Sequence, residues 1–475
     1  MNRKGVIMRE YQIKIEPFNF MALQEFKIKR TINEHAKASI AMRIKDDWKE
    51  QYIGILSKKT WVKVSGVGEQ EGSIGATNTV LFYGIVTDFL FENNGYETIL
   101  KIELTSGTVL MDLQPHFRVF QNQNATCIGI HQKLSNTYKD GQVICMEGES
   151  DKTEGVLIQY QETDWEFLKR VAARNGRYLV SDALKKGSRY TIGLPEGKKR
   201  TISLNKIKLK FDMAEYMEKL QNGISDLQST DMMELILTER EIFQLGDRTS
   251  YQGRDFYIWK IVTDYDGAEC VHTYYFRTKE ALERLPLAHN EIIGCSFDAI
   301  ITDVQKDKVQ IEIDKDEWKA AGGKNWFLYS TVYSSSDGTG WYCMPEIGDS
   351  VRLYVPEKEE DSFIISAVHK ETDTSRQKPD YKSFKTKYGK EILFTPDAIL
   401  MTNNKGMMVE VNDSEGIMIT SDKDIVIEAE DNLTISSGNA SLLIAANDVL
   451  QVKQGGTSMT LSGDISFTGG EFRIQ

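Results

Sequence analysis

The C-terminal part of the chain repeats a short pattern about every eight residues. In each copy a turn residue precedes two apolar residues separated by one position, most clearly in Gly416–Ile419, Asp424–Ile427 and Asn432–Ile435. Such apolar residues point to the same face of a strand. The resulting ribbon carries one apolar stripe that a single chain cannot bury. The pattern therefore predicts a rod in which identical chains wind around a common axis. Looser copies follow at Leu442/Ile444, Leu450/Val452, Met459/Leu461, Ile465/Phe467 and Phe472/Ile474.

Composition limits the class of protein. The chain has 475 residues, a mass of 54.1 kDa and 40% hydrophobic residues, enough for several domains with real cores. Its net charge of −12 argues against a binder of nucleic acid or anionic membranes. The five cysteines form no CxxC pair, which favours free thiols over disulfides or a zinc site. No apolar run is long enough to span a membrane, and the start of the chain does not resemble a secretory signal. We therefore expect synthesis in the cytoplasm.

Periodicity predicts a mainly β chain, with a β-rich α+β region first. Alternating residues predict strands throughout residues 10–105, and helical spacing appears at Trp165–Ala172 and near Met213–Leu220. Residues 274–286 are expected to form a helical or loop connector. The predicted domains are a β-rich base with two barrel-like subdomains and inserted helices (residues 1–290), a small barrel of oligomer-binding (OB) type (291–370), a polar linker (371–383) and the repeats (384–475).

Two further segments contain sequence patterns that resemble those of a known protein family. The first is a Q-Y-x-E-x-D-W-x-F-x-x-R pattern, and the second includes Pro345 and Gly348 within Gly338–Val351. In this order, and followed by the repeats, they resemble the valine–glycine repeat protein G (VgrG) spikes of type VI secretion and the hub and spike of contractile phage tails. The residues that match the first pattern are Gln159, Tyr160, Glu162, Asp164, Trp165, Phe167 and Arg170.

The resemblance implies a homotrimer with a hub, an OB-fold collar and a triple-stranded β-helix needle. Contraction of a sheath would drive the inner tube and this spike through a target envelope. The implied partners are the inner tube protein, baseplate proteins, a PAAR-like tip protein and the target cell envelope, with no nucleic acid. The family includes type VI systems, phage tails, tailocins and extracellular injection particles, and the short chain without an effector extension favours a phage-tail-like particle.

Two sets of residues follow from the needle interpretation. We expect the trimer seam to be formed by Ile417, Ile419, Ile425, Ile427, Leu433, Ile435, Leu450 and Val452. We expect the tip protein to dock on Ile465, Phe467, Phe472 and Ile474, because no later repeat covers them.

The signature residues are expected to maintain the fold. Thr163 or Asp164 can cap a helix, and Pro345 with Gly348 can set a turn that leads into a strand. The acidic run Glu357–Asp361 is expected to be a solvated loop. No HExxH, GxSxG or Walker A sequence occurs, so we expect no catalytic residue, metal or cofactor. The pair Glu162 and Asp164 could form a glycosidase dyad, but we interpret these residues as caps and salt-bridge partners. A tail-associated cell-wall hydrolase without an identified site, and a receptor-binding fibre, stay open as alternatives.

Overall fold

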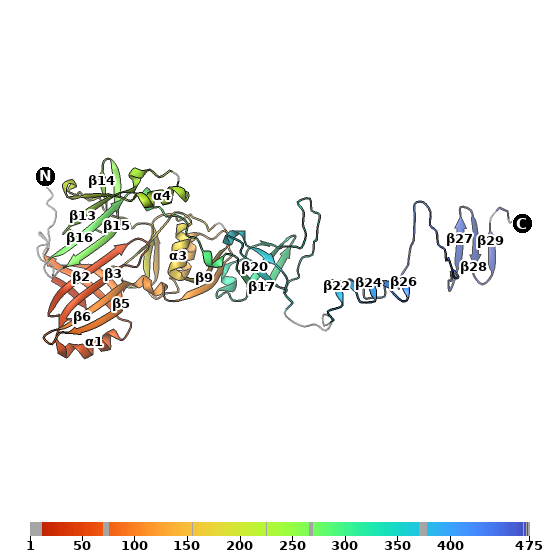
Figure 1. Cartoon of the computed structure of the whole chain (residues 1–475), viewed down its shortest axis with the longest axis horizontal. Coiled ribbons are helices and arrows are strands. Elements are labelled where there is room, and N and C mark those ends of the chain that lie inside the picture. Colours follow the sequence, from red (N-terminus) through yellow and green to blue (C-terminus); the bar gives the residue numbers. More distant parts are fainter. Residues whose placement is uncertain are drawn as a thin grey trace. The chain divides into compact units, whose positions relative to one another are not determined.

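The structure is a computed structural model that describes residues 12–69, 76–153, 155–224, 226–265, 269–369, 378–468, 470–471 and 473. It contains two compact units, Met1–Lys370 and Glu371–Gln475. In both, strands are the main regular secondary structure (Figure 1). Within the described residues, no helix is both long and apolar enough to cross a bilayer.

The first unit is built on an eleven-stranded antiparallel sheet. Neighbouring strands in this sheet come from two separate stretches of the chain, which join where β2 pairs with β15. In sheet order the strands are β1 (Gln12–Glu16), β4 (Trp61–Glu69), β5 (Ala76–Asn93), β6 (Thr98–Ser106), β3 (Lys37–Ile44), β2 (Ala22–Thr31), β15 (Arg254–Tyr265), β16 (Cys270–Arg277), β13 (Met233–Glu239) and β12 (Lys208–Phe211), with β14 (Arg248–Tyr251) paired to β15.

Alternation of apolar residues explains the N-terminal half of this sheet. In β3, Ala38, Ile40, Met42 and Ile44 are all buried, while the residues between them are partly exposed. Helix α1 (Lys49–Leu56) contributes Tyr52 and Leu56 to the same core. The predicted strands within residues 12–105 are therefore confirmed.

The predicted connector at residues 274–286 is wrong in its first part. Residues 274–277 belong to β16, where residues 274–276 pair with β13 on one side and β15 on the other, and Arg277 pairs with β15 alone. The short helix α5 (Lys279–Leu282) begins only after Thr278, whose hydroxyl accepts a hydrogen bond from the N–H of Ala281. Two neighbouring strands override a local pattern that favours a connector. Helix α4 (Met213–Gln221) forms where helical spacing predicts it.

A helical layer separates the large sheet from the last domain of the first unit. Helices α2 (Cys127–Ser135) and α3 (Asp164–Ala173) share a core with a small sheet. That sheet contains β8 (Gln142–Cys145), β11 (Arg189–Ile192) and β10 (Leu179–Ser181). The strands β7 (Pro115–Phe120) and β9 (Leu157–Thr163) form an antiparallel pair, and β9 leads directly into α3.

A five-stranded sheet ends the first unit. Its order is β19 (Phe327–Leu328), β18 (Lys308–Ile313), β17 (Ser296–Gln305), β20 (Ser350–Tyr354) and β21 (Phe363–Ile365). Its two edges approach each other, because the N–H of Ser330 donates to the carbonyl of Ile364 over 2.8 Å and Tyr329 bridges Ile364. The strands predicted for residues 296–301, 308–313, 349–355 and 363–368 all form, although the last is shorter than predicted.

The second unit contains two separate antiparallel sheets in which each strand pairs with the next along the chain. The first sheet contains β22 (Lys382–Lys385), β23 (Glu391–Phe394), β24 (Ala398–Thr402), β25 (Met408–Asn412) and β26 (Gly416–Thr420). The second contains β27 (Leu450–Gln454), β28 (Thr457–Leu461) and β29 (Ile465–Thr468).

No paired strand forms between these two sheets, at residues 421–449. The sequence predicted short strands there, at Asp424–Ile427, Asn432–Ile435 and Leu442/Ile444. A strand needs a hydrogen-bonded neighbour, and none is offered to these residues by the described parts of this single chain. The strands predicted at these positions are therefore not formed within the single chain.

Candidate functional site

Helix α3 is capped by Thr163, one of the two capping residues that the sequence offers. The hydroxyl of Thr163 accepts a hydrogen bond from the N–H of Glu166 over 3.2 Å, and the Glu166 carboxylate accepts one from the N–H of Thr163 over 3.0 Å. This reciprocal pair is a capping box, which satisfies two N–H groups that lack a partner inside the helix. The capping role predicted for Thr163 is confirmed, and it fixes where the signature side chains point.

The aromatic residues of the signature lie in the core. Trp165 and Phe167 are fully buried, and the Phe167 ring stacks on Phe120 with ring centres 5.2 Å apart. Trp165 meets the Tyr190 ring edge-on at 5.7 Å. Tyr160, on the preceding strand, packs edge-on against Phe297 of the five-stranded sheet at 5.1 Å. The signature segment therefore contacts both the helical layer and the last domain of the first unit.

Asp164 is a buried acceptor rather than a free acid. Its carboxylate accepts hydrogen bonds from Arg118 Nη1 at 2.5 Å, Gln159 Nε2 at 2.9 Å and the Tyr138 hydroxyl at 2.6 Å. Burial and this neighbouring carboxylate raise the pKa of Tyr138, so the hydroxyl keeps its proton and donates it. With its oxygens engaged in this way, Asp164 has no geometry for acid–base work on a substrate.

Arg170 is the centre of a second charged cluster. It donates to both oxygens of Glu162, at 2.7 Å from Nε and 2.8 Å from Nη2, and to the carbonyl of Ile158 at 2.9 Å. Its Nη1 lies 2.9 Å from Oε1 of Glu359. Burial alone would lower the pKa of Arg170, but the charges of Glu359 and Glu162 outweigh it and raise the pKa. The guanidinium is thus held charged inside the protein.

The prediction of a solvated loop at Glu357–Asp361 is wrong for Glu359. This side chain is buried and also meets Arg174 at 3.3 Å and the N–H of Ile158 at 3.2 Å. Burial raises the pKa of Glu359, but the charge of Arg170 and the remaining hydrogen bonds lower it overall. Glu360 alongside it pairs with Arg174 at the surface. The turn before β21 is therefore tied to α3, and we name Arg170, Glu162, Glu359 and Arg174 the ionic joint.

Pro345 and Gly348 lie in the turn that leads into β20. Pro345 is buried, and Gly348 has a φ of +95°, in the left-handed region that side chains disfavour. The Asp349 carboxylate accepts a hydrogen bond from the N–H of Glu346 over 2.8 Å, which closes the turn. The turn predicted from this pair of residues is confirmed.

The first sheet of the second unit has one face covered with exposed apolar side chains. Residues directly opposite on neighbouring strands share a face, so the register defines two rows that cross the sheet. One row is Phe384, Ile392, Met401, Val409 and Ile419, and the other is Phe394, Ile399, Val411 and Ile417. All nine side chains are exposed in the single chain, by 37% to 74% of their surface. We name these nine residues the apolar face.

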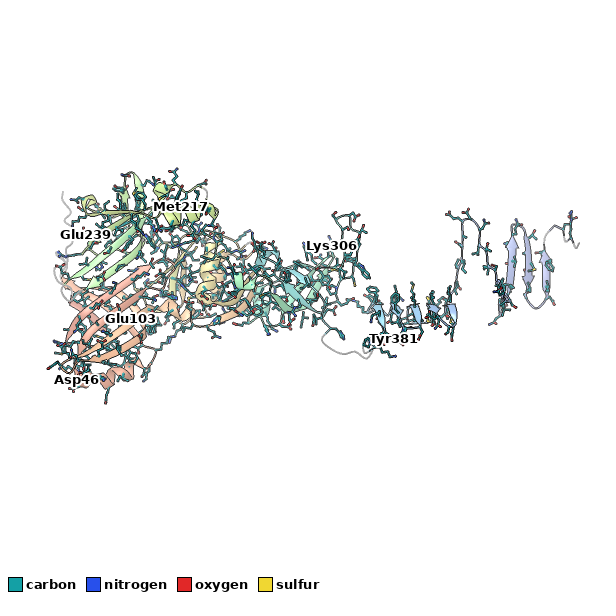
Figure 2. The ribbon with its side chains drawn as sticks, in the orientation of Figure 1. Asp46, Glu103, Met217, Glu239, Lys306 and Tyr381 are labelled. Carbon is teal, nitrogen blue, oxygen red and sulfur yellow. The ribbon has the colours of Figure 1, made fainter. Side chains whose placement is uncertain are left out.

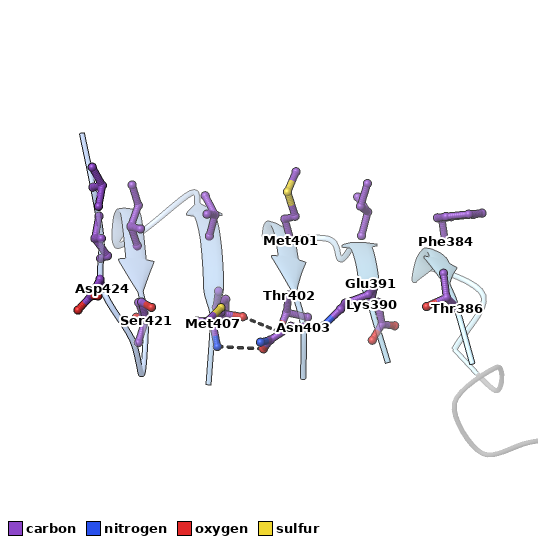
Figure 3. A pocket seen from close by; sticks show the side chains of 17 residues that line it. Phe384, Thr386, Lys390, Glu391, Met401, Thr402, Asn403, Met407, Ser421 and Asp424 are labelled. Atoms are coloured by element: carbon purple, nitrogen blue, oxygen red, sulfur yellow. Dashed lines mark hydrogen bonds between the residues drawn. The ribbon is translucent and has the colours of Figure 1, made fainter. Parts of the chain in front are cut away.

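Part of the apolar face lines a groove of about 600 Å³ (Figure 3). Phe384 and Met401 lie in one row across the strands, and Asn403 and Ser421 lie toward the opposite strand ends. Ile419 and Ile425 also line the groove, so the segment after β26 borders the groove at this end of the sheet. The groove is open and lined mainly by apolar side chains, as expected for a surface that another chain covers.

The second sheet repeats this arrangement. Its register places Leu450, Leu461 and Ile465 in one row and Val452, Met459 and Phe467 in the other, all on one face. The opposite face carries Gln, Lys, Ser and Thr residues. Ile465 and Phe467, expected to dock a tip protein, thus share a face with Leu450 and Val452, expected in the seam. Phe472 and Ile474 lie outside the described residues.

The remaining seam residues lie on the segment without paired strands. Ile425, Ile427, Leu433 and Ile435 each expose more than half of their surface.

Within the described ranges, no cluster of three or more His, Cys, Asp or Glu side chains is arranged to hold a metal ion. The features that stand out are therefore apolar surfaces and the buried ionic joint. The sequence did not predict the roles of Arg118 and Glu359. For Arg118, a charged residue within the otherwise apolar stretch Phe117–Phe120 could have indicated a buried ion pair.

Comparison with known proteins gives a family match and several structural matches. Residues 67–194 match the family model of the phage tail baseplate hub (GPD). No match is found among curated proteins. An E. coli structure, the c3393 protein, is described as a type VI secretion component similar to the T4 tail proteins gp27 and gp5. It aligns at 13% identity and a TM-score of 0.50, covering 75% of this chain and 100% of that one.

Two Francisella structures of a PdpA–VgrG complex align at 10% identity. The lidded form has a TM-score of 0.56 and covers 87% of this chain and 80% of that one. The half-lidded form has a TM-score of 0.54, with 87% and 88% covered. At these identities the matches establish the fold. Residues 67–194 thus match the baseplate hub family, and the chain shares its fold with the VgrG structures over most of its length.

Proposed function

We propose that three copies of this chain form the central hub and spike of a contractile injection machine. The role is structural rather than enzymatic. The apolar face carries the proposal, because nine exposed apolar side chains in register on one sheet exceed what a monomer keeps in water. Winding three such faces around an axis would bury them, and residues 421–449 would then find strand neighbours on other copies.

In this arrangement each part of the chain has a mechanical task. The eleven-stranded sheet of the hub would form the barrel-like base that caps the inner tube and meets baseplate proteins, and the five-stranded sheet would form an OB-type collar. The second unit would be the triple-stranded needle that pierces the target envelope when the sheath contracts. A needle held by many backbone hydrogen bonds, each worth about 0.5–1.5 kcal/mol, resists shear because they must fail together.

The seam and the tip belong to the same proposal. Ile417, Ile419, Leu450 and Val452 would face the axis. At the far end, Ile465 and Phe467 would lie next to a small PAAR-like tip protein that covers the last strand edges. The shared face of β27, β28 and β29 supports an apolar axis that continues to the end of the described strands.

Mass in solution tests the proposal directly. Light scattering coupled to size exclusion should give three times the 54.1 kDa of one chain at micromolar concentration. A clean monomer would overturn it. In assembled particles, an antibody against the C-terminal residues should label the leading end of the tube before contraction, and particles without this protein should lack a closed tube end.

A further inference from the structure

In the first unit, a hairpin on the five-stranded sheet carries exposed apolar side chains. It spans Thr331–Tyr342 and projects from the sheet that contains β17 and β20 (Figure 1). Six large apolar side chains in and beside it are exposed: Leu328, Val332, Tyr333, Trp341, Tyr342 and Ile347. Val332 is 96% exposed and Tyr342 76%. We name these six residues the aromatic hairpin patch.

The hairpin holds its shape although its side chains are exposed. The N–H of Trp341 donates to the carbonyl of Tyr333 over 2.8 Å, and the N–H of Ser335 donates to the carbonyl of Thr339 over 2.8 Å. Gly340 has a φ of +140°, and a Cβ there would lie 2.3 Å from the carbonyl oxygen of Tyr333. A preordered backbone lowers the entropy cost of binding, so this hairpin is built to present its side chains.

The hairpin is also fastened to the sheet. The Tyr342 hydroxyl donates to the carbonyl of Lys306 over 3.0 Å, at the turn between β17 and β18, and Lys306 is labelled in Figure 2. The Thr331 hydroxyl donates to the carbonyl of Trp341 over 3.0 Å. A load on the hairpin would therefore pass into the sheet rather than bend a free loop.

Charge indicates which partner fits. Asp337 is the only charged residue between Leu328 and Pro345, in a chain with 27% charged residues and a net charge of −12. Two copies of such an acidic chain repel each other over most of their surfaces. A neutral aromatic patch is where two copies can approach without burying unpaired charge.

Chain connectivity brings a second copy within reach. The chain between His369 and Lys378 spans at most roughly 30 Å even when fully extended. If the needles of three copies share an axis, the five-stranded sheets that precede them are held close to that axis and to each other. We infer that the aromatic hairpin patch docks on the five-stranded sheet domain of a neighbouring copy, as a clamp between subunits. This inference rests on the trimer proposed above.

A cysteine beside the hairpin gives a direct test. Cys343 is exposed in the single chain, and Cys145, far from it in the sequence, is partly exposed. Maleimide labelling of the full chain, read out by peptide mass spectrometry, should be about ten-fold slower at Cys343 in the trimer than in a monomer, because a docked patch excludes water. Cys145 should label equally in both. The monomer is full-length Ile419→Asp, or wild-type chain diluted until its mass falls to 54.1 kDa.

Substitutions provide the second measurement. Trp341→Ala and Tyr342→Ser should each shift the trimer–monomer equilibrium toward monomer by about ten-fold or more, as expected for an aromatic anchor. Tyr96→Ala, at a side chain 97% exposed on a different hairpin, is the matched control and should change nothing.

Each result distinguishes this inference from the proposal beneath it. A trimer in which Cys343 labels as fast as in the monomer overturns the clamp and leaves the trimer intact. Protection that appears only in assembled particles assigns the patch to another particle protein and also overturns the clamp. A wild-type chain that stays monomeric overturns the proposed function and the clamp with it.

Discussion

Arg170 on helix α3 and Glu359 in the turn before β21 form a buried ion pair, with Nη1 and Oε1 2.9 Å apart. The two residues lie far apart in the sequence, and both are almost fully shielded from water. Together with Glu162 and Arg174 they join the signature helix to the five-stranded sheet domain. The charged and aromatic residues of the signature segment thus contribute contacts between the helical layer and the five-stranded sheet domain.

Breaking this pair should destabilise the first unit. Glu359→Gln leaves Arg170 buried with one carboxylate fewer, which costs about 3–5 kcal/mol for a buried pair. The midpoint of urea unfolding, followed by tryptophan fluorescence, should fall accordingly. Glu360→Gln removes the more exposed pair with Arg174 and should cost at most about 1 kcal/mol. Equal midpoints for the two variants would contradict a joint centred on Glu359.

Acid should weaken the first unit through His131. Burial lowers the pKa of His131 from 6.5 to about 3, so below pH 6.5 the unfolded chain takes up a proton that the folded chain does not. Stability is therefore lost as the pH falls, by about 2 kcal/mol between pH 7 and pH 5. His131→Phe should flatten the decrease of the melting temperature over this range. His369→Phe, at an exposed position, should leave the decrease unchanged.

A charge on the apolar face should prevent assembly. Ile419→Asp would place three carboxylates together in an apolar centre, at a cost of several kcal/mol per ion unless they stay protonated. Light scattering should report a monomer. Met418→Asp is the control, because Met418 points to the opposite face, directly across from Glu410, where a carboxylate is already present. A trimer that survives Ile419→Asp unchanged would contradict the seam.

Residues 421–449 should gain protection only in the assembly. Hydrogen exchange of their amides should be fast in the Ile419→Asp monomer, since no strand pairs with them within one chain. In the trimer, exchange around Ile425, Ile427, Leu433 and Ile435 should slow by orders of magnitude. Ile427→Asp should restore fast exchange there. Equal exchange in monomer and trimer would show that this segment does not join the needle.

Features set by short-range chemistry could be predicted from the sequence. The capping of α3 depends on Thr163 and Glu166, three positions apart. The turn at Gly348 and the strand β17 likewise follow from local residue types. Features set by distant partners could not. Glu359 looked like part of an exposed acidic run because its partner Arg170 comes from another domain, and residues 274–277 became a strand because β13 and β15 lie on either side.

The repeats depend both on local spacing and on distant partners. The same spacing of apolar residues gives a paired strand at Gly416–Ile419 and none at Asp424–Ile427. Periodicity determines which side chains can share a face, but hydrogen-bonded neighbours determine whether a strand exists. The pairing of β22 to β26 within one chain could not be predicted from the eight-residue repeat, since residues 382–412 precede the clear copies of this repeat.

If other copies cover the nine side chains of the apolar face, the stability of the second unit is subject to mass action. Their burial would come from other copies, so the free energy of unfolding of residues 382–420 would depend on the concentration of the chain. Newly made chains would compete between correct assembly and random association through the same surface. Synthesis of several copies from one messenger, close together and in step, would favour assembly, and dilution would undo it.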